Sequence, residues 1–255
     1  MRLAEQTTIR RLLLAVLALL APVAARATPS STYWAPSVAT CQAKYVPHIT
    51  YDTYYRRAAA YPIDTGLTMG VLPGDKVQAE VGYDTLFPGQ NPTQFYLNGK
   101  VCLPENSIRK GIPAFSAGVY DVGFKQDVTN FNVVYFMAQK SLPPGGYISG
   151  GFYFGTNDVL FTNSDGNVAK TGALVGWTSP DIKIGLKGLS KITIIADVQT
   201  GKNILGAGGP GVDIYFNDYI ALIVGPVFFI DKDLQPGRSR VLWTTQLDVD
   251  IPLGR

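Results

Sequence analysis

The sequence predicts an all-β fold, a single antiparallel transmembrane β-barrel of about 12 strands, with 10 as the alternative, after a cleaved signal peptide. Three observations predict this fold. Apolar and polar residues alternate with a period of two along much of the chain, which is typical of strands with two unlike faces. The connections between these strands alternate between short and long, as in outer-membrane barrels. An export leader precedes the first strand.

Residues 1–27 are the predicted signal peptide. Arg10 and Arg11 precede an apolar run at 12–21, and the small-residue cleavage site Ala-Arg-Ala follows at 25–27. About ten apolar residues are too few for a transmembrane helix, which needs roughly 20. The leader holds four arginines and one glutamate, so it carries the whole formal charge of +3. The mature chain is therefore neutral, and nucleic acid is not expected as a partner.

Period-two alternation is clearest in the segments 63–71, 76–86, 94–103 and 241–251. The last of these places Trp243 and Leu247 on one face and Gln246 and Asp248 on the other. Strands are expected at 46–55, 63–71, 76–86, 94–103, 112–122, 129–140, 146–155, 171–178, 191–199, 208–216, 219–230 and 241–251.

An even number of strands places both ends of the barrel at the side of the short turns, which is the periplasm. Residues 28–45 are then expected as a periplasmic N-terminal segment, and 46–255 as the barrel. Two connections on this side, 104–111 and 179–190, are longer than a tight turn. We expect the second to hold a short helix or a distorted strand.

The polarity of the two faces favours a membrane barrel over a soluble sandwich or a lipocalin-like barrel. A membrane barrel turns its apolar face to lipid and its polar face to the lumen. Polar residues are frequent in mid-strand, and aromatic residues such as Tyr83, Trp177 and Trp243 gather near strand ends, where interface girdles lie. The lumen-lining candidates are Asp64, Lys76, Gln78, Glu80, Asp84, Asn98, Lys100, Asp197 and Asp213.

Residues 61–73 and 78–84, with the later stretches 118–123, 127–129, 132–135 and 246–250, resemble a group of proteobacterial outer-membrane barrels. Some members of that group are assigned to a phenol-degradation (meta-pathway) barrel family. The resemblance covers most of the mature chain. It implies an outer-membrane location and a role in transport, and it supplies no catalytic residues.

Few residues could carry chemistry. His48 is the single histidine, and a hydrolase of the outer-membrane phospholipase type would need a serine beside it, which the local sequence does not offer. We therefore expect a rim histidine, no catalytic residue, no metal and no cofactor. Cys41 and Cys102 are both expected at the periplasmic rim, and that compartment is oxidising, so a disulfide between them is predicted.

The expected function is a passive channel or transporter for small solutes in the outer membrane of a Gram-negative bacterium. The polar lumen candidates are then either a charge network that stabilises the interior or a constriction that selects solutes. The expected partners are outer-membrane lipid and small solutes. The alternatives are a closed barrel with a structural or surface-interaction role and, less favoured, an outer-membrane hydrolase.

Overall fold

The computed structural model describes residues 33–55, 62–72, 74, 76–87 and 94–253, so the predicted signal peptide lies outside the described residues. The elements are β1 (Pro47–Tyr55), β2 (Ile63–Leu72), β3 (Gln78–Phe87), β4 (Phe95–Leu103), β5 (Ala114–Val122), β6 (Val133–Ser141), β7 (Tyr147–Gly155), β8 (Thr171–Thr178), β9 (Ile182–Lys183), β10 (Lys191–Gln199), β11 (Ala207–Tyr215), β12 (Ile220–Phe229), η1 (Lys232–Leu234), η2 (Pro236–Arg238) and β13 (Val241–Asp250).

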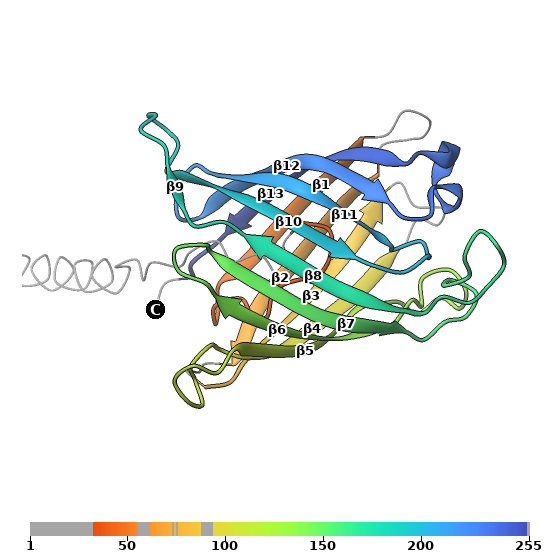
Figure 1. The fold of residues 1–255 in the computed structure, drawn as a ribbon, viewed down its shortest axis with the longest axis horizontal. Helices are drawn as coiled ribbons and strands as arrows, with labels where there is room; N and C mark the ends of the chain where they lie inside the picture. Colours follow the sequence, from red (N-terminus) through yellow and green to blue (C-terminus); the bar gives the residue numbers. More distant parts are fainter. Residues whose placement is uncertain (1–32, 56–61, 73, 75, 88–93, 254–255) are drawn as a thin grey trace, which may run out of the picture.

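Twelve long strands form a closed antiparallel barrel (Figure 1). Each of these long strands pairs with the next long strand in the sequence, and the pairing of β13 with β1 joins the last strand to the first. The short strand β9 pairs with the start of β10, and β8 pairs with the rest of β10. The predicted all-β barrel of 12 strands is therefore confirmed. Within the described residues, no helix is long and apolar enough to cross a membrane.

The strand bounds agree closely with those predicted, and the largest difference is at the start of β6. This strand begins at Val133 and not at 129, because residues 125–130 form a turn closed by a hydrogen bond from the Thr129 N–H to the Lys125 carbonyl. The connection 179–190 contains β9, a strand of only two residues. We call the end of the barrel with the connections 104–113, 142–146, 179–190 and 216–219 the short-turn end, and the opposite end the long-loop end.

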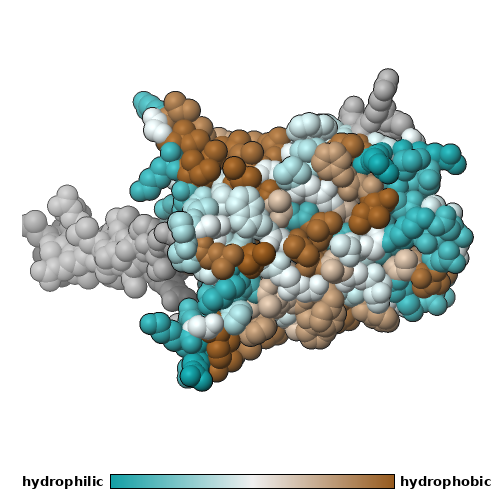
Figure 2. Space-filling model, viewed as in Figure 1, coloured by the Kyte–Doolittle hydropathy of each residue, from teal (hydrophilic) through white to brown (hydrophobic). Residues whose placement is uncertain are grey.

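The two faces of the wall differ in polarity as the alternation predicts. In β13, Thr244, Gln246 and Asp248 are buried inside the barrel, whereas Trp243 is 56% exposed on the outside. Figure 2 shows that hydrophilic residues gather at the two ends, while apolar and neutral residues cover most of the wall between them. The outer face is therefore apolar and the inner face polar, the reverse of a soluble barrel.

The interior is occupied by most of residues 33–46, which we call the inner segment. We expected residues 28–45 as a segment in the periplasm; residues 33–42 lie inside the barrel, with Ala35, Ser37 and Ala39 fully buried, whereas Ala43 and Tyr45 are exposed. Glycines on the inner face make room for it. A Cβ atom added at Gly211 would lie 2.8 Å from the ring of Tyr33.

A disulfide bond between Cys41 and Cys102 joins the inner segment to β4, with the two Cα atoms 5.9 Å apart. Both cysteines are buried, and they are the only cysteines in the sequence. The bond closes a covalent loop that contains β1, β2 and β3. The inner segment therefore has a covalent attachment to the wall in addition to its chain connection at β1.

Intact-mass analysis after alkylation tests this bond. Protein isolated from the bacterial envelope and denatured without reductant should gain no alkyl group, because neither thiol is free. After reduction it should gain two.

The Cys102→Ser variant serves as the control, since its remaining thiol should react without reductant. Double alkylation of the unreduced wild-type protein would show that the bond does not form.

Candidate functional site

The candidate site is the lumen, where the inner segment meets the wall. Near the long-loop end, the buried carboxylate of Asp197 on β10 accepts hydrogen bonds from the inner segment. The donors are the backbone N–H groups of Tyr33 (2.9 Å), Trp34 (3.0 Å) and Ala35 (3.3 Å) and the hydroxyl of Ser37 (2.9 Å). Four donors compensate for the removal of this charge from water. They fix the start of the inner segment against β10.

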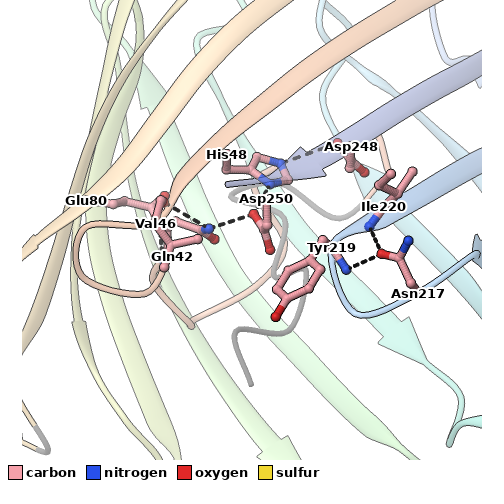
Figure 3. A network of polar contacts seen from close by, with 9 residues as sticks. All are labelled: Gln42, Val46, His48, Glu80, Asn217, Tyr219, Ile220, Asp248 and Asp250. Atoms are coloured by element: carbon pink, nitrogen blue, oxygen red, sulfur yellow. Dashed lines mark hydrogen bonds and ion pairs between the residues drawn. The ribbon is translucent and has the colours of Figure 1, made fainter. Parts of the chain in front are cut away.

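Near the short-turn end, Gln42 bonds to two strands of the wall that lie three positions apart in the sheet, β3 and β13 (Figure 3). Its backbone N–H donates to the carboxylate of Glu80 at 2.6 Å, and that carboxylate pairs with the Lys100 ammonium at 3.2 Å. The side-chain amide of Gln42 donates to Asp250 at 2.8 Å and to the carbonyl of Val46 at 3.2 Å. One residue of the inner segment is thus bonded to both β3 and β13.

His48 lies beside this network, buried between two carboxylates of β13. Its Nδ1 is 2.9 Å from Asp250 Oδ1, and its Nε2 is 3.3 Å from Asp248 Oδ1. Both ring nitrogens therefore face acidic groups. Neither nitrogen is positioned to accept a proton from a serine hydroxyl. Within the described ranges, no group of three or more histidine, cysteine, aspartate or glutamate residues is arranged to hold a metal ion.

A cavity of about 220 Å³ remains between the inner segment and the wall formed by β1–β5. Asp52, Asp64, Asp84 and Asp121 line it, and the pair of Glu80 and Lys100 borders it. Among the described residues that line the cavity, five are carboxylates and one is a cation. Acidic side chains therefore outnumber basic ones around the cavity.

Asn98 organises one side of the cavity. Its side-chain amide donates to Asp84, and its side-chain carbonyl accepts the N–H of Asp121 at 3.1 Å. Asp121 has a left-handed backbone conformation with φ of 51°. Because this conformation interrupts the alternation of β5, both Tyr120 and Asp121 line the cavity.

The nine residues predicted to line the lumen separate into groups. Glu80 and Asp197 bond to the inner segment, Lys100 pairs with Glu80, and Asp64, Asp84 and Asn98 line the cavity. Asp213 is buried on β11, and Gln78 is partly buried at the start of β3. Lys76 lies outside the lumen: it is exposed in the bend before β3, because that strand begins two residues later than predicted.

Several lumen residues were absent from the predicted set. Asp52, Asp248 and Asp250 lie on the polar faces of their strands, so the same period-two rule could have identified them. Gln139 on β6 accepts the N–H of Ala39 at 3.0 Å, and no sequence signal indicates this contact, because it depends on the inner segment.

No protein-family model matches the chain, and no curated protein matches it. Among solved structures, the chain is similar to a NanC porin in a rhombohedral crystal form, with a TM-score of 0.48 and 10% sequence identity over 80% of this chain and 100% of that chain. This similarity is too low to assign a family or a solute to the chain. The resemblance to the phenol-degradation group stays a prediction.

The Asp197→Asn variant should be less stable by about 2–4 kcal/mol, because an amide cannot accept all four hydrogen bonds and its own NH₂ would face N–H donors. Urea unfolding of the protein in lipid vesicles measures the change. Asp213→Asn is the matched control: it removes a buried carboxylate that lies outside these contacts, and a change below about 1 kcal/mol is expected. Equal losses in both variants would contradict the role of Asp197.

The Gly70→Ala variant should disturb the inner segment, since the new Cβ would lie 2.2 Å from the Gln42 carbonyl oxygen and 2.5 Å from that of Ala43. We expect a loss of about 1–3 kcal/mol in unfolding free energy. Gly99→Ala is the control, because its Cβ would meet nothing closer than the Glu80 carbonyl at 3.7 Å. If Gly70→Ala proves as stable as Gly99→Ala, the inner segment does not pack against β2 as described.

Proposed function

We propose that the protein is an outer-membrane barrel that conducts small solutes passively and prefers cations. The observation that carries this proposal is the acidic cavity beside the inner segment, lined by Asp52, Asp64, Asp84 and Asp121. A closed wall of low polarity surrounds this cavity, which strengthens the field of the carboxylates within it. Solutes would pass between the inner segment and the strands β1–β5.

Three properties of the wall support the membrane location. The outer face is apolar: Val81, Val101 and Phe152 lie on it, and each is at least 50% exposed. The sheet is closed, so no strand edge would leave backbone groups without partners in lipid. The long strands have eight to ten residues, close to the roughly 9–11 that a tilted strand needs to span a bilayer. The predicted signal peptide supports export to the outer membrane.

The cavity size limits what can pass. A volume of about 220 Å³ corresponds to roughly seven water molecules at about 30 Å³ each. Small hydrated ions fit this space, whereas larger solutes would require the inner segment to move. Such a movement would break the hydrogen bonds to Asp197 and Gln139, while the bond between Cys41 and Cys102 would still hold the segment at one point.

A closed barrel with a structural role is the second candidate function. The observation that favours it is the bonding of the inner segment to opposite walls, through Asp197, Gln139 and Gln42. A hydrolase is disfavoured, because the ring nitrogens of His48 both face carboxylates. A measurement of ion conductance distinguishes the channel from the closed barrel.

In planar bilayers, the folded protein should give small, reproducible currents with cation preference. The double variant Asp64→Asn with Asp84→Asn should lower the ratio of cation to anion permeability by roughly threefold or more, because it removes two of the carboxylates that create the local potential. Reversal potentials in a salt gradient measure the ratio.

The control is the double variant Asp181→Asn with Asp218→Asn, which removes two exposed carboxylates outside the cavity and should leave the ratio unchanged. Absence of reproducible current from folded protein would favour the closed barrel. A current whose selectivity is insensitive to Asp64 and Asp84 would contradict the proposed path.

A further inference from the structure

The outer wall carries an apolar groove of about 520 Å³ across β4–β7. Its floor is made of small residues: Ala117 lies between Val101 and Phe136 in the sheet, and Ala138 lies beside Gly150. Larger side chains rise around this floor, and the rings of Phe136 and Phe152 lie 5.3 Å apart. The groove is therefore a depression in a surface that otherwise carries large apolar side chains.

Gly150 is a position in this groove at which a side chain is missing. A Cβ atom added there would meet nothing closer than the Leu174 carbonyl oxygen at 4.0 Å. The glycine is thus not required by close packing of the wall. Because Gly150 has no side chain, there is space here for a partner on the outer face.

Cations gather where the groove meets the short-turn end. Lys140 follows Ala138 by two residues on the outer face of β6, so it stands at this end of the groove. Its ammonium pairs with Glu105 at 2.6 Å and donates to the carbonyl of Gly111 at 3.2 Å. These contacts hold the connection 104–113 beside the groove.

The same connection exposes Arg109 and Lys110. Hydrogen bonds from Lys140 and Ser141 hold the pKa of Glu105 below its usual range, so this carboxyl is ionised at neutral pH. The connection at this end of the groove therefore carries two exposed cations in addition to the ion pair of Lys140 with Glu105. The excess positive charge favours an anionic partner at the level of a lipid headgroup.

We propose that this groove binds an anionic glycerophospholipid, with one acyl chain over Ala117, Ala138 and Gly150 and the phosphate near Arg109, Lys110 and Lys140. An apolar depression that ends in a basic cluster matches the two parts of such a lipid. A second copy of this chain would bring the same cations to the interface, which repel. The inference rests on the proposed membrane location, but not on conduction.

Native mass spectrometry of the full-length folded protein in detergent tests the proposal, with dioleoylphosphatidylglycerol and dioleoylphosphatidylcholine as probes. The wild type should retain the anionic lipid preferentially. Gly150→Leu should weaken retention of both lipids about tenfold, because it fills the groove. The double variant Arg109→Gln with Lys110→Gln should weaken retention of the anionic lipid only, by roughly fivefold for each cation removed.

Lys183→Gln with Lys187→Gln is the matched control, since it removes two exposed cations from the connection 179–190 at the same end of the barrel. It should bind both lipids as the wild type does. Heat-dependent gel mobility checks that each variant is folded, and the two loop variants remain informative if Gly150→Leu fails to fold. Equal retention of the two lipids, or anionic-lipid binding unchanged in the Arg109 and Lys110 variant, would overturn the proposal.

Two further results distinguish the lipid site from a dimer interface and from the proposed channel. A dimer lost on Gly150→Leu, without any change in lipid retention, would assign the groove to a second copy and overturn the lipid site. Preferential lipid retention by a protein that gives no current would support the lipid site and contradict only the channel.

Discussion

The structure depends on one constraint: polar groups that the closed sheet turns inward must find partners inside the barrel. The outer face is apolar, so the period-two alternation of the strands directs carboxylates and amides into the lumen. Burying such groups without partners is costly. The inner segment meets part of this constraint, because its backbone N–H groups supply donors to Asp197, Glu80 and Gln139.

The same constraint explains why the lumen is partly filled and partly open. Inward-facing glycines such as Gly70 and Gly211 provide the width for the inner segment. Where the segment does not reach, the carboxylates of Asp52 and Asp64 border an acidic cavity. The packed region contributes hydrogen bonds and packing, and the open region is where we propose that solutes pass. Both properties arise from the same set of inward strand positions.

Most of the barrel could be predicted from the sequence, because strand alternation is a local pattern that each segment carries by itself. The path of the inner segment could not, since its contacts join residues far apart, such as Tyr33 with Asp197 and Gln42 with Asp250. Asp121 also escaped prediction, because its left-handed backbone places it on the inner face out of phase with the alternation.

The central claim is that the wall is apolar outside and that the inner segment lies within it. Quenching of single tryptophans by brominated phospholipids in vesicles tests both parts directly. Trp243 lies on the outer face, whereas Trp34 lies in the lumen, where its Nε1–H donates to the Leu205 carbonyl at 2.9 Å and its ring contacts that of Phe229. In variants that lack Trp177 and retain only one of these two tryptophans, we expect strong quenching of Trp243 and little of Trp34. Comparable quenching of both, or protection of Trp243, would contradict the account.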